Sequence, residues 1–202
     1  MNVRYFDNAA TTRVKDEVLE EMLPYLKEKF GNPSSMYTIG REAKKAIENA
    51  RERVAKLINC KANEIYFTGS GSESDNTAIK GIAHKRAFKG KHIITSKIEH
   101  PAVLHTCQSL EREGFKVTYL NVNKDGIVDI NQLINSIRND TILISIMYAN
   151  NEIGTIQPIH DIAKIAKMHN IVFHTDAVQA CGNITHTRDV RLMGGLMKIM
   201  PF

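Results

Sequence analysis

Residues 92–104 read HIITSKIEHPAVL and join two kinds of local structure in one short stretch. The first part, HIITSK, is rich in β-branched residues and predicts a strand. Pro101 suits the first turn of a helix, and apolar residues then recur at helical spacing at Val103, Leu104, Cys107 and Leu110. We therefore expect His100 at the carboxyl end of a strand, immediately before a helix.

The same alternation of strand and helix patterns runs through the chain from about residue 64. The strand candidates are residues 64–68, 92–97, 116–122, 141–149 and 171–175. A second helical spacing follows Pro158, at Ile159, Ile162, Ala163 and Ala166. This rhythm is typical of a parallel sheet wrapped by helices. We therefore expect an α/β fold, with a three-layer and mostly parallel sheet flanked by helices.

The two ends of the chain differ from this central pattern. Residues 13–29 and 42–58 both predict helices. The polar loop between them, FGNPSSMYTIG, is either a connector or a carrier of ligand contacts. Residues 185–202, THTRDVRLMGGLMKIMPF, hold two adjacent glycines and show no clean period. We expect the α/β pattern to break there, as if the domain were cut short.

Composition argues against several classes of function. With 43% hydrophobic and 24% charged residues in 202, the chain suits a globular domain with a sizeable core. The net charge of +5 is scattered, so no nucleic-acid surface is expected. Three widely spaced cysteines and eight histidines show neither a disulfide framework nor a metal-ligand spacing. The lack of a signal core or a membrane-length apolar run predicts a cytoplasmic protein without a membrane segment.

The segment YFTGSGSESDN places Gly69, Ser70, Gly71 and Ser72 ahead of a helix. Backbone N–H groups and the positive end of the helix dipole can receive an anion there, and a phosphate is the natural candidate. An ordinary Ser N-cap with a glycine turn explains the same residues. The segment matches neither a Walker A loop nor a dinucleotide fingerprint.

Polar side chains also follow three of the predicted strands. They are His100, the pair Asn150 and Asn151, and Asp176 with Gln179. Each has a plain alternative, since histidines often cap helices and asparagine pairs often make turns. A buried Asp, however, usually faces a cation or several donors. The carboxyl ends of parallel strands meet at one edge, so the set would fit pyridoxal phosphate, with Asp176 beside its ring nitrogen.

Six segments together carry a resemblance to a known family. They are YFDNAATT, GNPSSMYTIGREAKKAIENARERVAKLI, YFTGSGSESDNTAIKG, EHPAVL, YANNEIGTIQP and HTDAVQACG. From residue 3 to about 184 the chain resembles the pyridoxal-phosphate cysteine desulfurases, the class V branch of the fold-type I aminotransferases. The resemblance implies the large domain of that fold, in incomplete form.

The resemblance also implies roles for individual residues. Gly71 and Ser72 would contact the phosphate, where the family usually has Ala-Thr or a similar pair. His100 would be the catalytic residue that stacks on the cofactor ring and moves protons. Asn151 and Gln179 would meet the phenolic oxygen, and Asp176 the pyridinium nitrogen. No metal is implied.

The resemblance further implies a domain division. Residues 1–15 would belong to a small domain, residues 16–184 to a partial large domain, and residues 185–202 to a divergent tail, with the C-terminal domain absent. The family's Ser-x-His-Lys motif, whose lysine anchors the cofactor, has no counterpart after Asp176, where Lys198 is the one lysine. None of Cys60, Cys107 or Cys181 lies where the family's nucleophilic cysteine should be. A frameshift or early stop near Thr185 would explain this change, and the downstream coding DNA tests that hypothesis.

Three functions follow from the resemblance. The first is a cysteine desulfurase that turns L-cysteine into L-alanine and an enzyme persulfide, as a homodimer serving a sulfur acceptor or scaffold protein in iron–sulfur cluster assembly or thiolation. The second is a catalytically incomplete fragment that binds pyridoxal phosphate. The third is a relative of selenocysteine lyase, with the same fold and cofactor.

Overall fold

The computed structural model describes residues 4–7 and 10–180. The described chain divides into two compact units, residues 4–67 and residues 68–180, and each is treated by itself. The predicted tail at residues 185–202, together with Cys181 and Lys198, lies outside the described residues. Across the described part of the chain, every helix is too short or too polar to span a membrane.

The first unit contains two helices, α1 (Asp16–Lys27) and α2 (Thr38–Leu57), and a short 3-10 helix, η1 (Ala62–Glu64). Both predicted helices are confirmed, although α2 begins at Thr38 and so shortens the polar loop before it. The predicted strand at residues 64–68 is wrong, because the chain leaves η1 without joining the described sheet. The Arg51 side chain donates to the carbonyl oxygen of Ile65, and Phe67 alone in this stretch takes part in a β-bridge.

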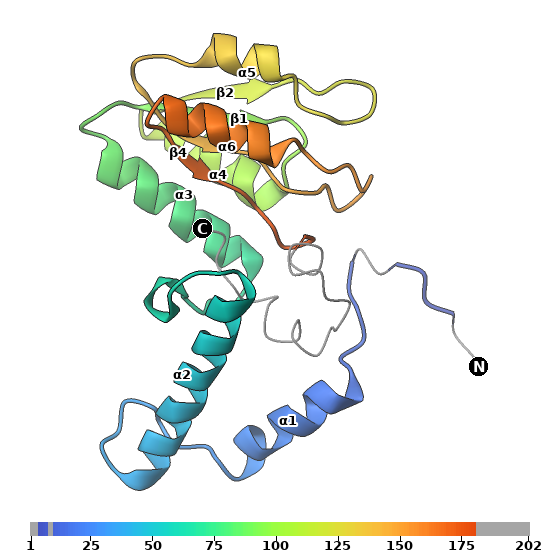
Figure 1. Cartoon of the computed structure of the whole chain (residues 1–202), viewed down its shortest axis with the longest axis vertical. Helices are drawn as coiled ribbons and strands as arrows, with labels where there is room; N and C mark the ends of the chain where they lie inside the picture. The colour runs from blue at the N-terminus through green and yellow to red at the C-terminus, as the bar shows by residue number, and fades with distance from the viewer. Residues whose placement is uncertain (1–3, 8–9, 181–202) are drawn as a thin grey trace. The chain divides into compact units, whose positions relative to one another are not determined.

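The second unit is the α/β layer structure, and its four strands are all parallel (Figure 1). Its strands, in the order β2-β1-β3-β4 across the sheet, are β2 (Lys116–Leu120), β1 (His92–Ser96), β3 (Thr141–Ser145) and β4 (Val172–His174). Its helices are α3 (Gly71–Arg86), α4 (Pro101–Arg112), α5 (Ile130–Ser136) and α6 (Ile159–Met168). The predicted parallel sheet with flanking helices is confirmed.

Neighbouring residues of each central strand feed two separate cores, one on each face of the sheet. Ile93 of β1 packs with side chains of α3 and α4, whereas Ile94 packs with side chains of α5 and α6. This division follows from the strand period of two, which sends successive side chains to opposite faces. The result is a three-layer arrangement, with a helix pair on each side of the sheet.

The chain reverses its direction of travel across the sheet between β1 and β3. From β1 it moves outward to β2 by way of α4, and from β3 it moves outward the other way to β4 by way of α6. In open α/β sheets, ligands bind outside the carboxyl ends of the strands at such a switch point. The fold therefore places the candidate site where β1 and β3 end.

Candidate functional site

Helix α3 begins at one side of this edge, with Ser70 as its N-cap. The Ser70 side chain accepts a hydrogen bond from the backbone N–H of Glu73 at 3.2 Å. The N–H groups of Gly71 and Ser72 lie in the first turn, which has no earlier carbonyl to bond. No acceptor for either N–H is found among the described residues. The plain interpretation of this turn is therefore confirmed, because Ser70 caps the helix. The two N–H groups leave the phosphate interpretation open as a prediction.

The turn lies directly against the loop that follows β4. A Cβ atom added to Gly71 would come 3.0 Å from Cγ2 of Val178, two residues beyond Asp176. This contact brings the predicted phosphate turn next to the loop that carries the predicted pyridinium partner. Two stretches about a hundred residues apart in sequence are thus joined at one place.

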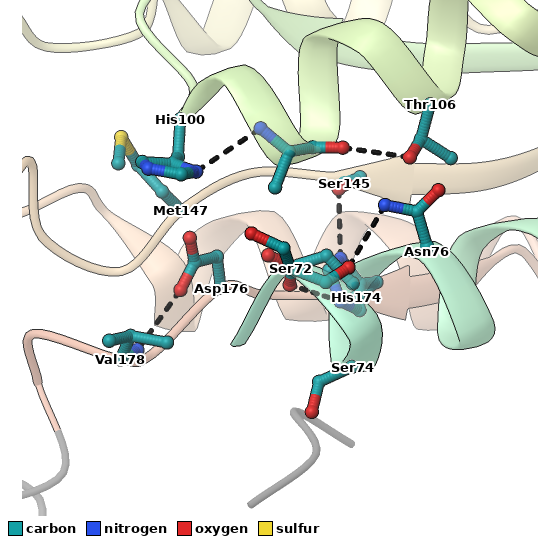
Figure 2. Close-up of polar contacts among 12 residues, drawn as sticks. Ser72, Ser74, Asn76, His100, Thr106, Ser145, Met147, His174, Asp176 and Val178 are labelled. Atoms are coloured by element: carbon teal, nitrogen blue, oxygen red, sulfur yellow. Dashed lines mark hydrogen bonds and ion pairs between the residues drawn. The ribbon is translucent and has the colours of Figure 1, made fainter. Parts of the chain in front are cut away.

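Asp176 is held at the end of a short extension of the parallel ladder. Beyond β3 the backbone N–H of Tyr148 donates to the carbonyl oxygen of Asp176 at 2.8 Å. The Asp176 side chain is 8% exposed, and its Oδ1 accepts from the N–H of Val178 at 3.0 Å (Figure 2). The carboxylate is therefore fixed at the strand end rather than free to rotate into solvent.

Two further carboxyl groups, Asp75 and Glu99, lie within reach of the charge of Asp176. Burial, and then the charge of Asp176, raises the pKa of Asp75 to about 7. Burial raises the pKa of Glu99 to about 8, against the lowering effect of hydrogen bonds from Ser96 and Met147. Like charges in a poorly solvated place disfavour one another's ionisation.

Glu99 joins the ends of β1 and β3. Its carboxyl oxygens accept from the backbone N–H of Met147 at 3.0 Å, and one of them accepts from the Ser96 hydroxyl at 2.5 Å. The side chain is 4% exposed. Because Glu99 immediately precedes His100, these bonds also fix the start of α4.

His100 is the N-cap of α4. Its Nδ1 accepts a hydrogen bond from the backbone N–H of Ala102 at 3.1 Å (Figure 2). The residue as a whole is exposed, at the strand-end edge predicted from the sequence. The capping role and the predicted role of stacking on a ligand ring are therefore compatible in one side chain.

The asparagine pair divides into one turn residue and one other. The side-chain amide of Asn150 donates to the carbonyl oxygen of Ile98 at 3.0 Å, and its Oδ1 accepts from the N–H groups of Glu152 and Ile153. Asn150 therefore makes the turn and ties it to the loop after β1. Asn151 follows it and is half-buried.

The remaining predicted residue, Gln179, is exposed in the turn after Asp176. The structure thus brings Gly71 next to the Asp176 loop and places His100 at the same strand-end edge. It gives no measured contact between Asn151 or Gln179 and Asp176. Their roles toward a ligand stay predictions.

Sequence reasoning missed three buried residues beneath this edge, namely Asp75, Glu99 and His174. His174 accepts or donates at Nδ1 with the Ser145 hydroxyl at 2.9 Å, and its Nε2 lies 3.6 Å from Oδ1 of Asp75. Burial lowers the pKa of His174 to about 4. The sequence does offer one signal, an acidic residue next to apolar helical or strand positions. An acid in such a place is seldom buried without a partner, so a polar partner could have been sought.

The two described cysteines do not provide a reactive thiolate. Cys107 is fully buried, and burial raises its pKa to about 12. Burial, followed by the charge of Glu64, also raises the pKa of Cys60. A thiol nucleophile needs a pKa lowered toward neutral pH. Within the described ranges no group of acids, histidines and cysteines could hold a metal ion.

Comparison with known proteins places this arrangement in a family. Residues 4–194 match the model of the aminotransferase class-V family, which is most of the 202-residue chain. The chain therefore belongs to the aminotransferase class-V family.

Within that family, the chain is similar to proteins described as cysteine desulfurases. It is 63% identical over 180 residues to the cysteine desulfurase IscS of Methanosarcina thermophila, a match that covers 89% of this chain and 45% of that protein. It is 59% identical over 180 residues to the cysteine desulfurase IscS of Clostridium botulinum strain Hall, with the same coverage.

Solved structures also match this chain over most of its length. A structure described as a NifS-like protein superposes with a TM-score of 0.85 at 47% identity and covers 87% of this chain and 49% of its own. A structure of SspA in complex with cysteine gives a TM-score of 0.85 at 44% identity, with 92% and 55% covered. The chain spans about half the length of the relatives it matches.

The buried acids predict a falling stability between pH about 6.5 and about 8. The pKa values of Asp75 and Glu99, about 7 and about 8, lie above the ordinary 3.8 and 4.5. The native state thus keeps protons that the unfolded chain loses, so stability falls as pH rises through this window. His174, whose pKa falls from 6.5 to about 4, has the opposite effect, but only below pH about 6.5. Melting temperature measured across pH 6.5 to 8 checks this.

The matched variants for this test are Glu99→Gln and Glu21→Gln. Glutamine at 99 keeps an acceptor for Met147 and cannot ionise, so the melting temperature should fall less steeply with pH than in wild type. Glu21 is exposed on α1, and its replacement should leave the slope unchanged. Equal slopes for Glu99→Gln and wild type would contradict the assignment.

Asn150→Ala should destabilise the chain by about 1–3 kcal/mol, because it leaves the Ile98 carbonyl and two turn N–H groups without their partner. Asn150→Asp keeps the acceptor for Glu152 and Ile153 but sets a carboxylate oxygen against the carbonyl oxygen of Ile98, so it should also be less stable than wild type. Urea unfolding followed by circular dichroism measures both. An Ala variant as stable as wild type would show that the turn forms without this side chain.

Proposed function

We propose that the chain is the cofactor-binding half of a cysteine desulfurase, and that it holds pyridoxal phosphate at the carboxyl edge of the sheet. The observation that carries the proposal is the contact between Gly71 and Val178. It puts free helix-end donors for a phosphate next to the loop of a fixed, buried carboxylate, Asp176. A ligand with an anionic group at one end and a protonatable ring nitrogen at the other fits both.

In this proposal each site residue has a stated task. The N–H groups of Gly71 and Ser72 bind the phosphate, helped by the dipole of α3. Asp176 keeps the ring nitrogen protonated, and bound pyridoxal phosphate would then supply an electron sink for bond changes at the α-carbon of an amino acid. Asn151 and Gln179 donate to the phenolic oxygen.

His100 covers the face of the ring and moves a proton at Nε2. Its Nδ1 already accepts the Ala102 N–H, so in the neutral ring the proton is on Nε2. Stacking on this residue would also exclude water from one face of the ligand. The substrate is L-cysteine, and the sulfur would pass to an acceptor or scaffold protein.

The names of the relatives support this substrate, and the structural neighbours support the fold that presents the site. The assignment of residues 1–15 to a small domain and 16–184 to a large one is part of the same proposal. So are the homodimer and the cytoplasmic location.

A second candidate is a chain that binds the cofactor without turning over cysteine. It is favoured by the sequence after Asp176, where the Ser-x-His-Lys motif has no counterpart up to residue 202. The two candidates are separated by adding pyridoxal phosphate, L-cysteine and a dithiol reductant, which releases persulfide sulfur as sulfide, to the purified chain. Sulfide release, with borohydride fixing the cofactor to a lysine peptide that contains Lys198, supports the first for this chain alone. Binding without sulfide supports the second.

Cofactor binding itself is tested with Asp176→Asn. Wild type should bind pyridoxamine 5′-phosphate, a probe that cannot react with surface lysines, and Asp176→Asn should bind it about tenfold more weakly, about 1.4 kcal/mol. The lost interaction is the charge-assisted bond to the ring nitrogen. Titration by fluorescence or calorimetry measures the affinity. The matched control is Asp140→Asn, at the opposite end of β3.

Two results would contradict the proposed site. One is a wild-type chain that binds this probe no better than pyridoxamine, which lacks the phosphate. The other is an Asp176→Asn variant with unchanged affinity.

A further inference from the structure

A buried polar chain links α3 to β4 directly beneath the candidate site. Asp75 is on α3, one turn after Gly71, and His174 ends β4, two residues before Asp176. Both are 1% exposed. Nε2 of His174 lies 3.6 Å from Oδ1 of Asp75. Nδ1 of His174 lies 2.9 Å from the hydroxyl of Ser145 (Figure 2).

The two facing atoms of Asp75 and His174 depend on each other. Within the described part of the chain, neither Oδ1 of Asp75 nor Nε2 of His174 has a hydrogen-bond partner. Buried polar atoms that stay unsatisfied destabilise the folded chain. A small approach of α3 to β4 would turn the 3.6 Å separation into a hydrogen bond that satisfies both.

The charges around the pair decide where its proton lies. Burial and the charge of Asp176 raise the pKa of Asp75, and burial lowers that of His174. An ionised Asp75 would add a second negative charge near Asp176, with Glu99 also close by. Both side chains are therefore favoured in their neutral forms, with Nδ1–H donating to Ser145. At 3.6 Å the Asp75–Nε2 separation is longer than a hydrogen bond, and a closer approach would let the Asp75 O–H donate to Nε2.

This pair is the second of two links between α3 and the segment formed by β4 and the loop after it. The first is the close approach of Val178 to Gly71, since a Cβ atom added to Gly71 would lie 3.0 Å from Cγ2 of Val178. Together they fix both the position and the tilt of the first turns of α3 relative to Asp176. These are the two ends that a ligand with a phosphate and a ring nitrogen must bridge.

We propose that Asp75, acting through His174 and Ser145, is a positioning residue that sets the separation between the phosphate-binding end of α3 and the carboxylate of Asp176. This inference rests on the proposed function. It differs from a purely structural role in what it predicts for binding. Replacing Asp75 should weaken the binding of ligands that reach both the α3 end and Asp176, and leave unchanged the binding of ligands that use one of these.

The test compares Asp75→Asn with Asp75→Leu in the full 202-residue chain. Asparagine keeps an N–H donor toward Nε2, whereas leucine has a similar volume and no donor. The probes are pyridoxamine 5′-phosphate, which bridges both ends, and pyridoxamine, which lacks the phosphate. We expect Asp75→Leu to bind the phosphorylated probe about tenfold more weakly, with pyridoxamine unchanged, and Asp75→Asn to bind both as wild type does.

His174→Phe supplies a second arm. If Asp75 acts through His174, the double variant Asp75→Leu, His174→Phe should bind the phosphorylated probe no more weakly than His174→Phe alone. Each single substitution already removes the same Asp75–His174 interaction. Additive losses would show that Asp75 acts on its own and would overturn the inference.

A measurement on the wild-type chain is independent of whether these variants fold. In a ¹⁵N-histidine sample, His174 should show a neutral ring with the proton on Nδ1 and an acceptor at Nε2. A protonated ring, or a proton on Nε2, would overturn the inference.

The outcomes also separate this inference from the proposed function. If wild type does not distinguish the two probes, the cofactor proposal fails, and this inference fails with it. If wild type prefers the phosphorylated probe and Asp75→Leu keeps the full preference, the cofactor proposal stands and the positioning role alone is wrong.

Discussion

The burial of three carboxyl groups close to one another at the carboxyl edge of the sheet is the constraint on which the candidate site depends. Asp75, Glu99 and Asp176 are each at least 92% buried and lie within reach of one another's charge. In so poorly solvated a place, three negative charges cannot be kept together. Burial and neighbouring charge raise the pKa values of Asp75 and Glu99, which lowers the negative charge gathered around Asp176.

The rest of the second unit keeps this cluster in place. Glu99 bonds the backbone of Met147 and so joins the ends of β1 and β3, while the ladder between Tyr148 and Asp176 joins β3 to β4. The two cores on either face of the sheet hold these strands with buried isoleucines and leucines. Rigid strands allow the edge to keep buried acids without partners of opposite charge.

Much of the architecture could be predicted from sequence, because short β-branched runs alternate along the chain with longer stretches of helical spacing. β1, β2, β3 and β4 all coincide with predicted runs, within a few residues at their ends. The prediction of a strand at residues 64–68 failed because β-branched and aromatic residues show only that a segment can be extended. Glu64 belongs to η1, and Phe67 alone takes part in a β-bridge. The short helix α5 was missed, since its seven residues are too few for a clear period.

The site divides in the same way. His100 and Asp176 could be placed from their positions after strands, and the capping and turn alternatives for His100 and Asn150 also proved to be real. What sequence could not supply was the layer beneath, since Asp75 and His174 are about a hundred residues apart and meet only through the packing of α3 on the sheet. Spacing rules report neighbours along one element, and this pair joins two.

The cap on α4 has a consequence for how His100 can take part in chemistry. The lone pair on Nδ1 accepts the N–H of Ala102. A proton taken up at Nδ1 would therefore break the hydrogen bond that caps the first turn of α4. Any acid–base cycle at His100 that used Nδ1 would loosen and retighten α4 at each step, whereas a cycle confined to Nε2 would leave the helix at rest. His100 therefore has one nitrogen available for proton transfer, Nε2, while Nδ1 holds the first turn of α4 in place.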